Sequence, residues 1–173
     1  MATQLKGASQ LRTALRKFEP DLAKELQDEM AAFLKPIVKK ARGYVPSDFT
    51  PSHWRADSKT GKWPVYNAAL MRRGIGYKTT PSKPNRRGFS YAASIRNKSA
   101  IGAIYERAGV RAPSGKKSSR PNFAQALGPM VGEGRLQGRA MFAAWNRDQG
   151  RATAAVMKAL QNAANNFKNR RVV

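Results

Sequence analysis

The spacing of apolar residues predicts that the chain begins with two helices. Leu11, Leu15 and Phe18 recur at i, i+4 and i+7, which places them on one face of a short helix. A longer stripe at steps of three or four residues follows: Leu22, Leu26, Met30, Phe33 with Leu34, and Ile37. Together the two patterns predict an N-terminal helical region over residues 9–43.

Helix-end signals support the longer of these two helices. Pro20 suits a first helical turn, and the acidic side chains lie in the first half while Lys and Arg fill the last turns, as the helix dipole favours. Pro36 lies inside the pattern and is expected to kink the helix or to end its regular part, because proline lacks the N–H that a helix interior uses. Gly43 provides a stop.

The next segment, residues 46–64, is predicted to be a long loop. It contains three prolines and several small polar residues, a composition that disfavours both helix and strand. Trp54 and Trp63 are expected to hold this loop against the rest of the protein, since large aromatic side chains gain much from burial.

Residues 65–109 are predicted to contain the sheet. A short helix from Val65 to Arg73, ended by Gly74, would turn Ala69 and Leu70 inward. In residues 75–80 and 89–96, mostly apolar or aromatic side chains alternate with mostly small or polar ones. This alternation indicates two strands joined by an extended basic loop.

A capped helix and a second helical region follow the strands. Ser99 is a predicted N-cap and Gly109 a predicted C-terminal stop for the short helix between them. Residues 110–121 form a basic, flexible loop by composition. Apolar residues at helical spacing return in a C-terminal helical region over residues 135–169.

These elements predict one domain over residues 1–173 with an α+β fold. The expected arrangement is a small antiparallel sheet packed with a long N-terminal helix and a long C-terminal helix, with extended basic loops between them.

Composition narrows the classes of function. The chain carries 33 Lys and Arg against 10 Asp and Glu, a formal net charge of +23, with one histidine and no cysteine. The lack of cysteine excludes disulfides and thiolate chemistry, and a single histidine makes a histidine-rich metal site improbable. No apolar run approaches the length of a membrane span, and the first residues lack the apolar stretch of a signal peptide. We therefore expect a cytoplasmic protein with anionic partners and no membrane association.

The positive charge is concentrated in the middle of the chain. Residues 1–29 hold five basic and five acidic groups, whereas residues 70–120 hold thirteen basic groups and one acid, Glu106. The candidate anion-facing or inter-subunit residues are Lys78, Lys83, Arg86, Arg87, Arg111, Lys116, Lys117 and Arg120. Charge alone leaves two interpretations open, a generally basic surface or a defined face against DNA phosphates or an acidic protein neighbour.

Candidate catalytic groups do not form a convincing set. His53 and Asp57 lie in one loop without a glycine-framed serine, and Asp57 in a D-x-K pattern lacks the further carboxylates that a metal-dependent nuclease needs. We therefore expect no enzymatic activity, no cofactor and no metal. Arg86 and Arg87 precede Phe89 and Tyr91 as in some single-strand binders, but the alternation favours the two aromatics as core residues of a strand.

One segment resembles a known family. Residues 94–109 read SIRNKSAIGAIYERAG, and this stretch is similar to the small neck and tail-completion proteins of long-tailed bacteriophages, in which a strand ending in N-x-S/A leads into G-A-I-Y-E-x-A-G. The resemblance extends upstream to residues 41–46 and 71–75, and downstream to residues 120–123, 126–127 and 139–145. It implies an α+β subunit that assembles with itself into a ring, expected to be hexameric, at the junction of head and tail.

The resemblance implies a function and partners. We expect a structural virion protein that completes the tail or neck and joins it to the head connector, after assembly in the host cytoplasm. Its partners would be further copies of itself, the neighbouring head-connector and tail proteins, and packaged double-stranded DNA. Glu106 would form a salt bridge between subunits or within one, with a capping or surface role as the alternative. A tail-terminator ring and a free basic nucleic-acid-binding protein are the other two hypotheses.

Overall fold

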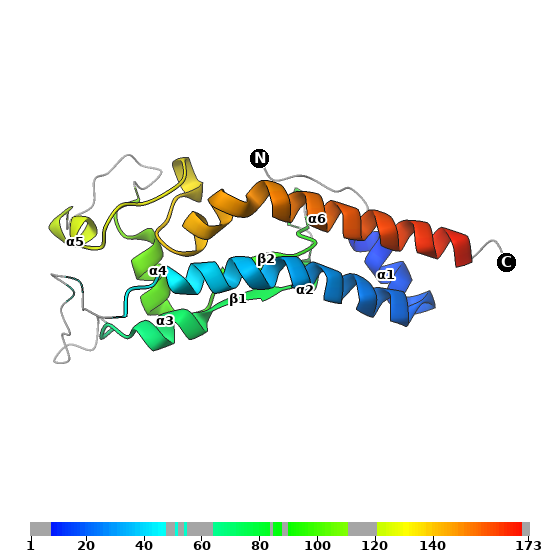
Figure 1. Cartoon of the computed structure of the whole chain (residues 1–173), viewed down its shortest axis with the longest axis horizontal. Coiled ribbons are helices and arrows are strands. Elements are labelled where there is room, and N and C mark those ends of the chain that lie inside the picture. The colour runs from blue at the N-terminus through cyan, green and yellow to red at the C-terminus, as the bar shows by residue number, and fades with distance from the viewer. Residues whose placement is uncertain are drawn as a thin grey trace. The chain divides into compact units, whose positions relative to one another are not determined.

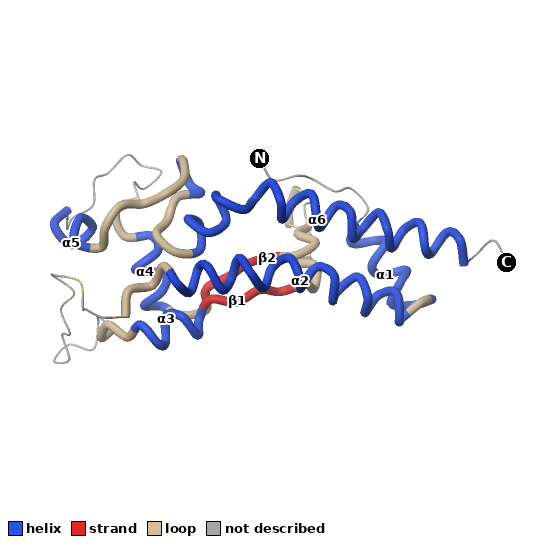
Figure 2. The backbone as a smooth tube through the Cα atoms, in the orientation of Figure 1, coloured by secondary structure: helices blue, strands red, loops and turns tan. Residues whose placement is uncertain are grey.

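The computed structural model describes residues 8–47, 51, 54, 64–83, 85–87, 90–110 and 121–170. In these residues, six α-helices and a two-stranded antiparallel sheet confirm the α+β fold, and the predicted long helices at the two ends are α2 and α6 (Figures 1 and 2). The elements are α1 (Ala8–Phe18), α2 (Pro20–Gly43), α3 (Ala68–Gly74), β1 (Ile75–Lys78), β2 (Ser94–Asn97), α4 (Ala100–Arg107), α5 (Pro121–Ala126), a 3-10 turn η1 (Gly134–Leu136) and α6 (Met141–Arg170).

The chain divides into two compact units. Unit 1 consists of Met1–Pro36, Tyr77–Ile95 and Asp148–Val173, and unit 2 consists of Ile37–Gly76 and Arg96–Arg147. Both units are therefore discontinuous in sequence, and α2 and α6 contribute residues to each.

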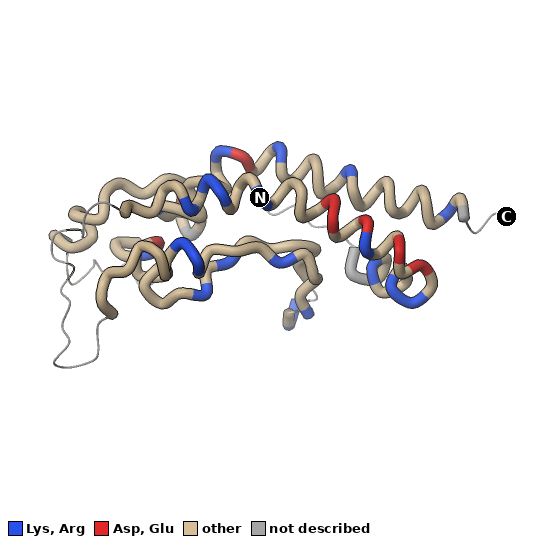
Figure 3. Tube along the Cα trace, turned by 60° about the horizontal axis from the view of Figure 1, so that its bottom comes forward, with Lys and Arg blue, Asp and Glu red and all other residues tan. Residues whose placement is uncertain are grey.

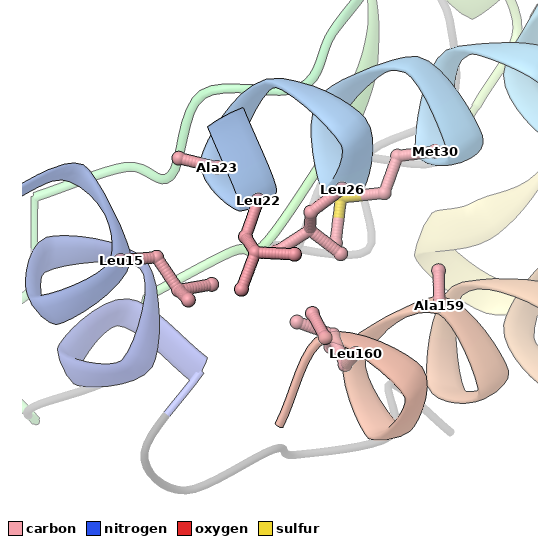
Figure 4. Packing of buried hydrophobic residues seen from close by; sticks show 8 residues of the cluster. Leu15, Leu22, Ala23, Leu26, Met30, Ala159 and Leu160 are labelled. Atoms are coloured by element: carbon pink, nitrogen blue, oxygen red, sulfur yellow. The ribbon is translucent and has the colours of Figure 1, made fainter. Parts of the chain in front are cut away.

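The core of unit 1 is formed by α1, the first half of α2 and the later part of α6. Figure 4 shows leucines of the three helices pointing toward one another. The cluster consists of Leu15, Leu22, Ala23, Leu26, Met30, Ala159, Leu160 and Ala163. The alanines of α6 present small side chains to this cluster, so the helix backbones can approach closely.

Two phenylalanines of the predicted stripes are not part of this core. Phe18 is 53% exposed and Phe33 is 42% exposed, although both share the predicted stripes with buried residues. In α2 the inward position is taken by Leu34, which is 3% exposed and lies one residue further round the helix. Pro36 does not end α2, which continues to Gly43 with Ile37 buried just beyond the proline.

In unit 2, Trp54 holds part of the loop that precedes α3. Its ring packs edge-on against Tyr66 and tilted against Phe123, and its Nε1–H donates to the carbonyl of Pro64 at 2.9 Å. This confirms the role predicted for Trp54, whereas Trp63 lies outside the described residues.

The short helix before the sheet differs from its prediction. It begins at Ala68, where the Asn67 side chain caps the N–H of Leu70. Met71 is its buried residue, while Leu70 is 48% exposed, so the prediction that Ala69 and Leu70 face inward is wrong. Packing accounts for the difference, because α3 contacts α4 and the neighbours of a short helix decide which of its faces is buried.

The second strand is shorter than predicted. It spans Ser94–Asn97, and the backbone before it is irregular, with Tyr91 64% exposed. The alternating pattern therefore does not mark Tyr91 as a core residue, and Phe89 lies outside the described residues. Hydrogen bonds from other parts of unit 1 occupy this backbone, as described below.

The connection from β2 into α4 is closely packed. Ser99 Oγ accepts from the N–H of Gly102 at 3.2 Å, which confirms the predicted N-cap, and Asn97 Oδ1 accepts from the N–H of Ser99 at 2.8 Å. The Asn97 side chain lies against two glycines. A Cβ atom would lie 2.6 Å from Asn97 Oδ1 if added to Gly74, and 2.8 Å from Asn97 Cγ if added to Gly102.

Gly102→Ala is therefore expected to destabilise the protein although alanine favours helix. Overpacking of a closely fitted site costs about 1–3 kcal/mol, which exceeds the gain in helix propensity of about 1 kcal/mol. Gly150→Ala is the matched control, because a Cβ at Gly150 of α6 meets nothing within 4 Å. Thermal unfolding of both variants should show a lower Tm for Gly102→Ala and an unchanged or higher Tm for Gly150→Ala. A raised Tm for both would contradict this account of Gly102.

Candidate anion-binding surface

The first group of candidate residues lies on and after β1 in unit 1. Lys78, Lys83, Arg86 and Arg87 are all exposed. Asn85 Oδ1 accepts from the backbone N–H of Arg87 at 2.9 Å, which fixes a turn at the two arginines. Four cations are thus available to an anion within ten residues of sequence.

The base of this loop is closed by hydrogen bonds. The N–H of Ser82 donates to the carbonyl of Tyr91 at 3.0 Å, and the N–H of Tyr91 donates to Ser82 Oγ at 2.9 Å. Just outside this pair, the guanidinium of Arg12 donates to the carbonyls of Thr79 and Ala92, the latter at 2.9 Å. One side chain from α1 therefore joins the two arms of the loop.

Arg12 is only 3% exposed, which is unusual for an arginine. Burial, followed by the nearby charge of Arg16, lowers the pKa of Arg12 from its ordinary value. The guanidinium stays protonated at neutral pH, and the carbonyl dipoles of Thr79 and Ala92 replace part of its lost hydration. Arg12 lies among the apolar residues of α1, but nothing in the sequence distinguishes it from an exposed arginine.

The second group of candidate residues cannot be placed. Arg111, Lys116, Lys117 and Arg120 lie outside the described residues.

Glu106 lies inside unit 2 rather than on its surface. It is 2% exposed, and its carboxylate accepts three backbone N–H groups at the start of α6, from Ala140 at 2.9 Å, Met141 at 3.1 Å and Phe142 at 2.7 Å. A buried carboxylate occupied in this way has no free face for a neighbouring subunit. The structure therefore corrects the expected inter-subunit salt bridge in favour of the capping alternative.

Arg139 is a second buried charge of unit 2, and its position in the sequence did not indicate that it would be buried. It is 7% exposed and donates to four carbonyls, those of Gly128, Tyr105, Ala108 and Ala124, at 2.8 to 2.9 Å. Burial lowers the pKa of Arg139, while Tyr105 and Glu106 act in the opposite direction. Each of the two buried charges is therefore held by backbone groups of the same chain.

Unit 2 contains few acidic residues to balance its basic ones. This unit contains eighteen Lys and Arg against four Asp and Glu, and one of the four acids is the buried Glu106. Unit 1 contains fifteen Lys and Arg against six Asp and Glu. Figure 3 shows that most of these acidic residues lie on the first half of α2. The exposed basic residues of β1 and its loop have no acidic residue near them in sequence, because residues 70–105 contain none.

In the described part of the chain, the Asp and Glu residues do not form a group of three that could hold a metal ion, and none of the helices is long and apolar enough to cross a membrane. His53 and Asp57, the weak candidates for catalysis, lie outside that part.

Comparison with known proteins gave no match to a family model, to a curated protein or to a solved structure.

Proposed function

We propose that this protein is a structural virion protein of a long-tailed bacteriophage, acting at the head–tail junction. Six copies would form a ring that completes the tail or neck and joins it to the head connector. The proposal rests on the resemblance of residues 94–109 to the neck and tail-completion family.

The packing of that segment is the observation that supports the proposal most. Asn97 and Ser99 order the turn into α4, Gly102 admits the Asn97 side chain, Glu106 caps α6, and Gly109 adopts a φ of 90°. Each of these residues has a structural reason to be part of the motif, and none is presented to a substrate. This is what a motif of a non-enzymatic assembly subunit would contain.

Charge is the second support. Six copies would carry a formal charge of +138, which repels within a ring unless anions surround it. The exposed residues Lys78, Lys83, Arg86 and Arg87 are suited to acidic neighbouring rings or to DNA in the channel. The charge would then make ring formation depend on those neighbours.

Electron microscopy of the phage that encodes the chain tests the proposal. We expect purified particles to contain the protein at six copies per junction, and a mutant lacking it to accumulate filled heads beside separate tails. Tails of normal length would indicate tail completion, whereas tails of uncontrolled length would indicate a tail terminator. Absence of the protein from purified particles would refute both virion roles.

A further inference from the structure

Tyr91 is exposed at the end of the basic loop of unit 1. Its 64% exposure is the largest of any exposed large apolar or aromatic residue in the described part of the chain. An aromatic ring in that position leaves most of its surface available to a ligand.

The backbone that carries Tyr91 is well anchored. Both the N–H and the carbonyl of Tyr91 bond to Ser82, and the next carbonyl, that of Ala92, accepts from the buried Arg12. The ring is therefore exposed on a fixed support, and little conformational entropy is lost when it meets a ligand.

Three cations accompany the ring in the same loop. Lys83 adjoins Ser82, the residue paired with Tyr91, and Arg86 and Arg87 occupy the turn fixed by Asn85. We define the Tyr91 cluster as the exposed side chains of Lys83, Arg86, Arg87 and Tyr91. It combines an accessible aromatic face with phosphate-binding groups.

We propose that the Tyr91 cluster binds single-stranded nucleic acid, with Tyr91 stacking on an unpaired base and the three cations contacting phosphates. Aromatic stacking combined with a basic surface is the usual means by which proteins hold single strands without reading their sequence. A duplex offers its phosphates but keeps its base faces stacked on one another. It would therefore contact the cations but not stack on the Tyr91 ring. An acidic protein would engage the cations but offers no unpaired base on which the ring could stack.

The test measures binding of the purified full-length chain to three labelled probes by fluorescence anisotropy. The probes are a 20-nucleotide oligo-dT, a DNA duplex of 20 base pairs and inorganic polyphosphate, which has the charge but no bases. Tyr91→Ala should weaken oligo-dT binding about tenfold, within the range known for loss of one stacked base, and should leave duplex and polyphosphate binding unchanged. Tyr91→Phe keeps the ring and should bind oligo-dT like the unchanged protein.

Charge variants complete the test. Replacing both arginines of the cluster, Arg86→Gln with Arg87→Gln, should weaken binding to all three probes and lower the salt slope for oligo-dT by about 1.4, at about 0.7 for each phosphate that is no longer neutralised. Lys158→Gln, which removes an exposed charge from α6, should leave the affinity of the cluster for oligo-dT within about twofold. Thermal melting of each variant checks that the fold is kept.

The inference is overturned if Tyr91→Ala binds oligo-dT as well as the unchanged protein, or if it loses oligo-dT and duplex binding equally. It does not depend on the proposed place in the virion. The binding assay uses the isolated chain, so its failure would leave the ring proposal standing, and absence from particles would leave the binding result standing.

Discussion

Glu106→Ala is expected to lower the free energy of unfolding by about 3–5 kcal/mol, because each buried donor left without its acceptor costs about 1–3 kcal/mol. The substitution removes the carboxylate that accepts three N–H groups at the start of α6. For a chain of this length the corresponding fall in Tm is about 6–20 °C. Calorimetry or thermal melting by circular dichroism measures it.

Two further variants make the Glu106 result interpretable. Glu133→Ala is the matched control, because Glu133 is exposed and makes no side-chain capping bond to η1, and its Tm should hardly change. Glu106→Gln keeps a carbonyl oxygen for the N–H groups but loses the charge, so its Tm should lie between those of the unchanged protein and Glu106→Ala. Equal melting of Glu106→Ala and Glu133→Ala would show that the carboxylate is not needed to cap α6.

Arg139→Met should have an effect of similar size, about 3–5 kcal/mol, because hydrogen bonds from a charged donor are worth about 1.5–3 kcal/mol each. Methionine fills much of the same space but leaves four carbonyls without their donor. Arg139→Lys should also be destabilising, because one ammonium group cannot reproduce the planar fork that reaches four acceptors. Arg151→Met on the exposed side of α6 serves as the control and should melt like the unchanged protein.

A double-mutant cycle separates the mutual pairing of the two charges from their individual bonds to the backbone. If Glu106 and Arg139 stabilise each other, combining Glu106→Gln with Arg139→Met should cost less than the two single effects added together, by about 0.5–3 kcal/mol. Strict additivity would mean that each side chain acts only on the backbone groups to which it bonds.

Local signals account for the parts of the fold that the sequence predicted well. The stripe of α2 and the Ser99 cap depend on residues three or four positions apart, so periodicity and capping chemistry reveal them. Helix starts were harder to predict, as α3 shows, which begins at Ala68 after the Asn67 cap rather than at Val65.

Long-range contacts account for what the sequence did not reveal. Glu106 meets Ala140 and its neighbours across 34 to 36 residues, and Arg12 reaches Ala92 across 80. A charged residue carries no local mark of whether it will be buried, so Arg12 and Arg139 looked like any other surface cation. Tyr91 was predicted to be a core residue because its neighbours alternate as in a strand. Its backbone N–H instead donates to Ser82, and its side chain is exposed.

The discontinuity of unit 1 has a consequence for synthesis on the ribosome. Leu22, Leu26 and Met30 are covered by Ala159, Leu160 and Ala163, which are made last. Because synthesis adds about 5–20 residues per second, the apolar stripe of α2 stays exposed for on the order of ten seconds before the α6 residues that cover it are made. During that interval the nascent chain exposes a leucine-rich helix, so folding of unit 1 is expected to be largely post-translational. Chains that end before α6 is complete would keep this helix uncovered and would be prone to aggregate.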